Sequence, residues 1–216
     1  MIENLEEKLA GNIPVNRKEL IDLISSWGRT LNMDLSYENI IIEVSKPKEC
    51  YQLENLDVSQ IEDFYVAFLC SLYNGNKLNW NTSKAKNMER MFEESIFDGD
   101  LSTFNLENCR TINGMFYGAK FNNDSLNNWN VSNIEEMYCT FNNSEFCGDI
   151  SNWNINPDVD MAATFNYNKN FLNKYNNGNL LSNLSSEKTV KWFLENQQKM
   201  REINSNKEEC LDTLSF

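Results

Sequence analysis

The residue types that carry out chemistry in proteins are sparse in this sequence. Histidine is absent from all 216 residues, which excludes Ser-His-Asp and Cys-His nucleophile systems and any histidine-ligated zinc or iron. The six cysteines form no C-x-x-C pair, so we expect thiols in a reducing compartment and no zinc site. Asp98-Gly99-Asp100 begins like a calcium loop but lacks the later oxygen ligands, so we expect a turn there. The sequence therefore predicts no enzyme, no cofactor and no metal site.

Side chains that can contact a partner protein are the remaining candidates for function. Acidic residues at positions that interrupt the regularity of the chain are better candidates than residues that recur at fixed spacing, because recurrence serves the structure. We predict partner-binding roles for eight acidic or amide residues: Asp57, Glu93, Glu94, Glu107, Asn128, Glu135, Glu136 and Asn152.

A repeat of 24 or 25 residues must position these side chains. Its aromatic markers are Trp80, Phe104, Trp129 and Trp153, and a degenerate first copy begins near Leu53. Apolar residues recur eight, twelve and about seventeen positions after each marker: Met88, Ile112, Met137, Met161; Phe92, Phe116, Phe141, Phe165; Phe97, Phe121, Phe146, Phe171. Self-similarity at this period predicts a solenoid of about five coils, in which stacking supplies the core.

Within each copy the pattern L-x-x-L-x-L is the strand signature of a leucine-rich repeat. Met88, Met91 and Phe92, at i, i+3 and i+4, predict one helical turn. We therefore predict an α/β repeat: a leucine-rich-repeat-like solenoid of about five 24–25-residue coils with parallel short strands, capped by N-terminal α/β elements and a C-terminal helix. The recurring Asn81, Asn105, Asn130 and Asn154 would form a hydrogen-bonded ladder along the stack or contact a ligand.

Two stretches carry a resemblance to a known family. W-N-T-S-x-x-x-N-M-x-x-M-F from Trp80 to Phe92 and W-N-V-S-N-I-x-x-M from Trp129 to Met137 resemble the BspA-like leucine-rich repeats of surface proteins in mycoplasmas and other AT-rich bacteria. The resemblance covers only the repeats. It implies a right-handed solenoid with protein-binding roles and supplies no catalytic residues.

The segments outside the repeats have patterns of their own. Asn16 and Glu19 predict a capped helix, and 40–44 reads as a strand that Pro47 closes. After Phe171 we expect a loop over 173–186, a helix that Ser186 caps, and no regular structure over 205–216. We therefore divide the chain into an N-terminal cap (1–52), the repeats (53–171), and a loop with a C-terminal helical cap (172–216).

The charge is concentrated in the repeats. The whole chain carries a net charge of −13, and residues 53–171 hold 17 acidic and 7 basic residues. Such a surface argues against direct binding to nucleic acid and favours a basic partner, although acidity can also serve only to keep the repeat soluble. The leading hypothesis is a non-catalytic intracellular binder that occupies a partner. A sharper hypothesis is a phage- or mobile-element-encoded inhibitor, anti-CRISPR-like or anti-restriction-like, of a basic nucleic-acid-binding effector.

The alternative is a BspA-like surface or adhesion protein whose export signal lies outside this sequence. Residues 1–7 carry acids where a signal peptide needs a basic start, and no segment approaches the roughly 20 apolar residues of a membrane helix. On these grounds we expect a cytoplasmic protein, in the host cell if phage-encoded, with no membrane contact.

Overall fold

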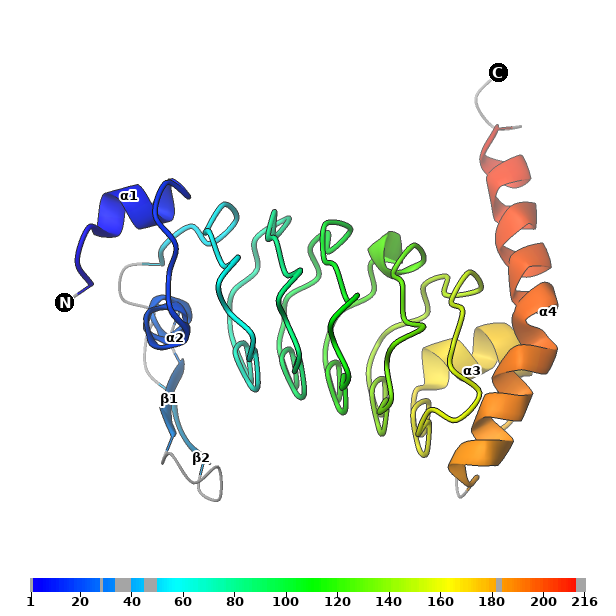
Figure 1. The fold of residues 1–216 in the computed structure, drawn as a ribbon. Helices are drawn as coiled ribbons and strands as arrows, with labels where there is room; N and C mark the ends of the chain where they lie inside the picture. The colour runs from blue at the N-terminus through cyan, green and yellow to red at the C-terminus, as the bar shows by residue number, and fades with distance from the viewer. Residues whose placement is uncertain (1, 28, 34–39, 45–49, 182–183, 213–216) are drawn as a thin grey trace.

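The structure is a row of coils with helices at both ends. The computed structural model describes residues 2–27, 29–33, 40–44, 50–181 and 184–212. In Figure 1 the N-terminal helices and a two-stranded hairpin lie at one end of the row, and two helices lie at the other. In chain order the elements are α1 (Leu5–Leu9), α2 (Arg17–Ser25), β1 (Arg29–Met33), β2 (Ile40–Val44), the short 3-10 helix η1 (Asp124–Leu126), α3 (Lys169–Asn176) and α4 (Ser186–Asp212).

The L-x-x-L spacing forms a turn in each coil rather than a strand. The Phe104 N–H donates to the Leu101 carbonyl at 3.0 Å, and the Trp129 N–H donates to the Leu126 carbonyl at 3.0 Å. This bond from i+3 to i is the hydrogen bond that closes a β-turn. All four of these side chains are buried. The apolar spacing is therefore satisfied by a turn that directs both residues to the interior.

The predicted fold class is wrong on this point. Between residues 50 and 181 the described chain contains no strand, and neighbouring coils share only single bridges such as Asn87 with Thr111. The two strands that the structure describes, β1 and β2, pair antiparallel with each other. A leucine-rich-repeat solenoid with parallel strands is thus overturned, and a stack of strandless coils takes its place.

The second half of each coil is a run of overlapping turns, which we call the turn segment. The turn segments of coils one to five are residues 63–71, 87–95, 111–119, 136–144 and 160–168. In coil two, Arg90 and Glu94 both have φ of 54°, in the left-handed region. The predicted helical turn at Met88, Met91 and Phe92 is therefore wrong, because a helix needs negative φ at every residue.

Alternate residues of a turn segment bind the next coil. The N–H groups of Met88, Arg90, Phe92 and Glu94 donate to carbonyls of coil three at 2.8–3.1 Å, while those of Met91 and Glu93 close turns within coil two. These four bonds all run from coil two to coil three, and the bonds in the opposite direction, from Arg110 to Lys86 and from Lys120 to Ser95 at 3.0 Å, lie at the two ends of the turn segment. This one-way pattern within the segment explains how the coils stack without a sheet.

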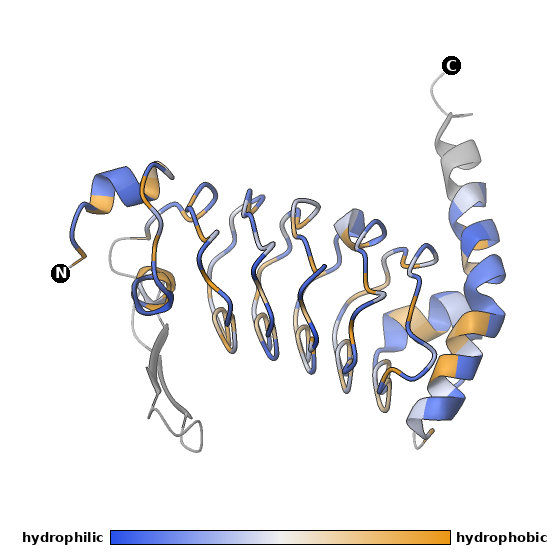
Figure 2. Cartoon of the chain, viewed as in Figure 1, coloured by the Kyte–Doolittle hydropathy of each residue, from blue (hydrophilic) through white to orange (hydrophobic). Residues whose placement is uncertain are grey.

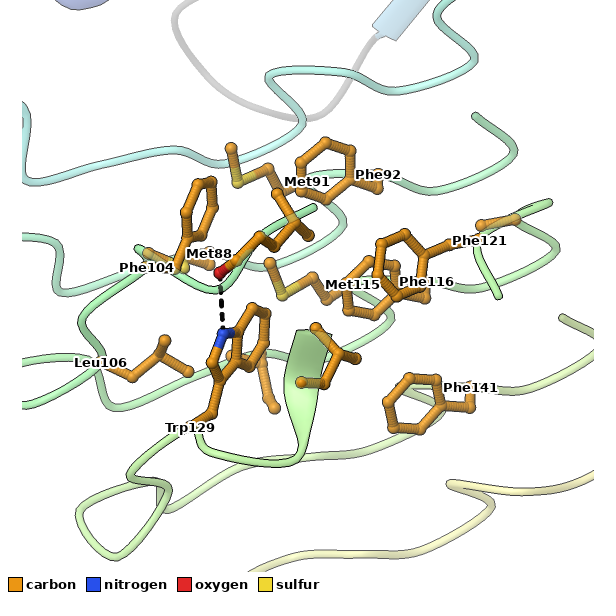
Figure 3. Packing of buried hydrophobic residues seen from close by; sticks show 14 of the residues in the cluster. Met88, Met91, Phe92, Phe104, Leu106, Met115, Phe116, Phe121, Trp129 and Phe141 are labelled. Atoms are coloured by element: carbon orange, nitrogen blue, oxygen red, sulfur yellow. Dashed lines mark hydrogen bonds between the residues drawn. The ribbon is translucent and has the colours of Figure 1, made fainter. Parts of the chain in front are cut away.

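Ladders of aromatic rings fill the interior. Phe92 stacks on Phe116 with ring centroids 5.6 Å apart, and Phe116 stacks on Phe141 at 5.5 Å. The same ladder runs from Phe68 to Phe165 and ends on Phe193 of α4. Figure 3 shows Phe92, Phe116 and Phe141 of this ladder together with Met88, Met91 and Met115. The prediction that the recurring apolar columns form the core is confirmed, since every residue in them is buried.

Tryptophan side chains also connect consecutive coils. The indole N–H groups of Trp80, Trp129 and Trp153 donate to carbonyls 27 or 28 residues earlier, at 2.8, 3.1 and 2.7 Å. Figure 3 marks the bond of Trp129 with a dashed line. Coil three has Phe104 at this position, and there the Thr103 hydroxyl donates to the Leu78 carbonyl at 2.8 Å. Each buried carbonyl of this column thus has a donor.

Helix α2 covers the first coil. The predicted cap is confirmed: the Asn16 side chain accepts from the Glu19 N–H, and the Glu19 carboxylate accepts from the Asn16 N–H. Glu19 also pairs with the largely buried Lys8 at 2.5 Å, and this hydrogen bond lowers the pKa of Glu19. Trp27 donates its indole N–H to the Tyr51 carbonyl at 2.8 Å and packs edge-on against Tyr73. The predicted strand over 40–44 is β2, whereas Pro47 lies outside the described residues.

Helices α3 and α4 cover the last coil. Helix α3 occupies part of the predicted loop, because the buried Asn168 side chain caps it and Phe171 continues a ring ladder. The Ser186 hydroxyl donates to the Val159 carbonyl of coil five at 2.9 Å, so it joins α4 to the stack. Figure 2 shows hydrophobic residues along α4 where it meets the coils. Helix α4 continues to Asp212, beyond the end that we predicted from the sequence.

Candidate interaction face

The outward positions of the turn segments form a continuous face in coils three to five. Their inward neighbours, such as Ile112, Met115 and Phe116, are buried. Backbone bonds place the outward residues of one coil beside those of the next, as from the Cys139 N–H to the Ala162 carbonyl at 3.1 Å. We call the part of this surface inside the row of Thr111, Glu136 and Asp160 the tyrosine face; it comprises Asn113, Tyr117, Gly118, Tyr138, Cys139, Asn143, Ala162, Ala163, Asn166 and Tyr167.

The tyrosine face carries no charged residue, although 24% of the whole chain is charged. Tyr138 is 50% exposed and Tyr167 is 63% exposed, both high fractions for a large side chain. Protein interfaces are depleted in charge at their centre and enriched in tyrosine. Antibody binding loops combine tyrosine with small and amide residues in the same way. The composition of this face is therefore that of a protein-binding surface.

Charged residues border the tyrosine face on both sides. On one side Lys120 pairs with Glu145 of the next coil. On the other side Arg110 lies 3.7 Å from Glu135, and Glu136 and Asp160 follow, all of them exposed. An uncharged centre inside a charged border is the arrangement found at interfaces, where the rim stays in contact with water.

The Asn113 side chain fixes two neighbours across the boundary between coils three and four. Its Oδ1 accepts the Tyr138 N–H at 2.7 Å, and its Nδ2 donates to Glu136 Oε2 at 2.8 Å. One coil further, Asp160 Oδ1 accepts the Ala162 N–H at 2.9 Å. Tyr138 therefore lies beside a pair of carboxylates, Glu136 and its bridge partner Asp160, that hydrogen bonds hold in place.

Electrostatic interactions at the border shift two ionisable groups. A hydrogen bond with Cys139 raises the pKa of Tyr138, and the Asp160 carboxylate raises it further. Burial raises the pKa of Glu89 in coil two, and the nearby carboxylates of Glu136 and Glu93 add to this shift against the effect of Arg90. The carboxylates of Asp160 and Glu136 thus contribute to these two shifts, after the hydrogen bond with Cys139 and the burial of Glu89.

The structure separates the eight residues that we predicted from the sequence. Glu136 and Glu135 lie on the border of the tyrosine face. Glu93 accepts two hydrogen bonds from Arg90, and the exposed Glu94 lies against the position of Gly118. Asp57 is half-buried and closes a turn with the Ser59 N–H at 3.0 Å. The remaining three are exposed in the first halves of their coils, apart from this face: Glu107, Asn128 and Asn152.

The recurring asparagines bond within their own coils. The side chains of Asn81 and Asn105 accept from the N–H groups of Ser83 and Glu107 at 3.1 and 2.8 Å. Asn130 accepts from Ser132 in the same way. These are Asx-turns, which hold the second turn of each coil. The predicted ladder along the stack is not formed at these three positions.

Sequence reasoning missed Tyr138 and Tyr167. It assigned the turn segments to helical turns, which gave the wrong set of outward positions. A usable signal was present, because the residue after each recurring methionine or isoleucine varies among glutamate, asparagine, tyrosine and alanine at 89, 113, 138 and 162. Variation beside a column that stays apolar in every coil marks an outward position.

Other kinds of site have little support. Among the described residues no group of three or more cysteine, aspartate or glutamate side chains could hold a metal ion. Two open grooves flank the stack: one of ≈ 480 Å³ between α2 and coil one, and one of ≈ 610 Å³ between coil five and α4. No helix in the described part of the chain is both long and apolar enough to span a bilayer.

Comparison with known proteins identifies a family. No characterised protein and no solved structure matches the chain significantly. One family model, described as "Mycoplasma protein of unknown function, DUF285", matches twice, over residues 39–146 and 120–209. The two matches together cover well over half of the sequence and include all five coils. The chain therefore belongs to this mycoplasma protein family of unknown function, DUF285.

Proposed function

We propose that the protein is a non-catalytic protein-binding protein that acts by occupying a partner through the tyrosine face. The observation that carries this proposal is the uncharged surface over three coils of an otherwise acidic chain, with Tyr138 and Tyr167 exposed at its centre and edge. Rigid aromatic side chains give a large contact area at a low cost in conformational entropy. The stack holds them on a rigid base, since the residues beneath are the buried ladder of phenylalanines.

A capture experiment with matched variants tests this proposal. The protein is immobilised and exposed to lysate of its host, and the retained proteins are compared between the wild type, Tyr138→Ala/Tyr167→Ala, and Asn128→Ala/Asn152→Ala. All three carry the same core, so thermal unfolding should be nearly unchanged. We expect the tyrosine variant alone to lose the retained proteins. Loss only in the asparagine variant would move the binding site to the first halves of the coils.

The BspA-like resemblance of the repeat motifs supports a second proposal, that of a surface or adhesion protein. The family description names mycoplasmas, the bacteria whose surface-protein repeats these motifs resemble. The resemblance concerns the sequence motif, since the coils lack parallel strands. Protease treatment of intact cells distinguishes this role from our leading proposal of a cytoplasmic binder. A surface protein is degraded under this treatment, whereas a cytoplasmic one is protected until the cells are lysed.

The narrower hypothesis of a phage-encoded inhibitor gains no support from the structure or the family match. Neither observation concerns phage, defence systems or inhibition. One part of that hypothesis can be examined separately, namely whether the partner protein is basic.

A further inference from the structure

The acidic residues of the repeats differ in whether they form ion pairs. Some pair with a basic residue of a neighbouring coil, as Glu62 does with Lys86 at 2.7 Å and Glu135 with Arg110, whereas in the described part of the chain most do not. For Glu136 and Asp160 the described residues include no cationic partner. These two residues are bridge partners on coils four and five, and both lie on the side of the face next to Tyr138, which is half exposed.

These carboxylates are held in position as well as lacking a cation. Asn113 holds Glu136 beside the Tyr138 backbone, and the Ala162 N–H holds Asp160 on the following coil. A side chain that is already oriented loses little entropy when it forms a new interaction.

We propose that Tyr138, Glu136 and Asp160 together receive a lysine or arginine side chain from a basic segment of the partner protein. The cation would lie over the tyrosine ring and form ion pairs with the two carboxylates. Cations are attracted to the face of a tyrosine ring, and charge-assisted hydrogen bonds to carboxylates are stronger than neutral ones. This inference rests on the proposed function and names the chemical class of the partner.

General attraction to the acidic chain is the competing explanation, because a net charge of −13 draws any polycation. The test uses a fluorescent arginine-rich peptide as the probe and measures its binding by anisotropy, with a peptide of neutral polar residues for comparison. The variant Glu136→Gln/Asp160→Asn removes two charges at the site. The control Glu107→Gln/Asp98→Asn removes two charges elsewhere on the surface. The residues changed in the variant and in the control are all exposed.

We expect the variant at the site to weaken arginine-peptide binding by about tenfold, since each exposed ion pair contributes up to about 1 kcal/mol. The control should weaken binding by less than about twofold, through long-range charge alone. Tyr138→Leu should weaken it by about two- to fivefold, whereas Tyr138→Phe keeps the ring and should bind almost as the wild type does.

Equal losses in the two charge variants would overturn the proposal in favour of general attraction. An unchanged affinity in Tyr138→Leu would also overturn it, because the ring would then play no part. Either result leaves the proposed function testable by itself. If Tyr138→Ala/Tyr167→Ala still abolishes capture from lysate, the face binds a protein that is not recognised through a cation.

Discussion

The inward and outward sides of the turn segments differ in how much they vary from coil to coil. One inward column is phenylalanine in all five coils, from Phe68 to Phe165, and its rings stack throughout. The neighbouring outward column reads Tyr65, Glu89, Asn113, Tyr138 and Ala162. The backbone conformation recurs from coil to coil, with positive φ at the equivalent positions Val66, Arg90, Gly114, Cys139 and Ala163. The comparison teaches that stacking constrains only the inward side, so specificity for a partner must come from the outward one.

The strongest test of this contrast compares Phe116→Ala with Tyr138→Ala. Phe116 contacts rings in the coils before and after it, so its removal leaves a cavity in the stack. We expect a loss of about 3–5 kcal/mol in the free energy of unfolding. Tyr138→Ala should change it by no more than about 0.5 kcal/mol, as for surface substitutions. Urea unfolding measures both values, and similar losses would contradict the division into two sides.

Two glycines, one inside the stack and one on the outward side, allow the same comparison to be made for the backbone. A Cβ on Gly99 would lie 2.6 Å from the Gly75 carbonyl oxygen and 2.6 Å from the Phe97 ring, inside the stack. We expect Gly99→Ala to destabilise by about 1–3 kcal/mol through overpacking.

Gly118 lies on the outward side with φ of +61°, and a Cβ there would meet only the flexible Glu94 side chain. Gly118→Ala should cost about 1 kcal/mol from the left-handed backbone alone. Thermal unfolding of Gly99→Ala and Gly118→Ala shows which variant loses more stability. A larger loss at Gly118 would show that the outward backbone, rather than packing, limits stability.

Trp129→Phe tests the hydrogen bonds that join the coils inside the stack. It removes the donor to the Leu101 carbonyl while keeping an aromatic ring. We expect a loss of about 1–2 kcal/mol, because a buried carbonyl is left without its donor. Coil three already has Phe at this position, with the Thr103 hydroxyl as donor. Adding Asn128→Thr, at the position equivalent to Thr103, should therefore restore part of the loss in urea unfolding.

Glu89→Gln tests the charge on the outward side and has the smallest expected effect. The pKa of Glu89 is raised in the folded protein, so its ionised form disfavours folding at neutral pH and its protonated form does not. The substitution should therefore raise the melting temperature slightly at pH 7. The gain should disappear as the pH falls through the raised pKa of Glu89. A gain that is independent of pH would assign the effect to another cause.

Much of the interior could be predicted from the sequence. Columns led by Met88, Phe92 and Phe97 identify buried residues in every coil, because a repeat that stacks must present the same apolar side chain at the same place. The capping residues of α2, Asn16 and Glu19, were equally readable, since a capping box depends only on residues three apart. Such features depend on local spacing.

The conformation of the coils could not be read in the same way. L-x-x-L places two apolar residues inward both in a strand-based repeat and in a β-turn, as at Leu101 and Phe104. The choice depends on which carbonyl each N–H finds, and half of those carbonyls in a turn segment belong to the next coil. The wrong choice displaced the predicted outward residues, so Glu136 was included whereas Tyr138 and Tyr167 were missed.

The sequence by itself determined the period, the buried columns and the acidity of this protein, because these depend on residue type and spacing along one chain. The tertiary structure decided the left-handed turns at Arg90 and Glu94, the absence of strands in the coils and the uncharged face around Tyr138. The physical reason is that these features depend on hydrogen bonds and contacts between coils. The backbone partners lie 22 to 26 residues apart and acquire their geometry only when the coils are stacked.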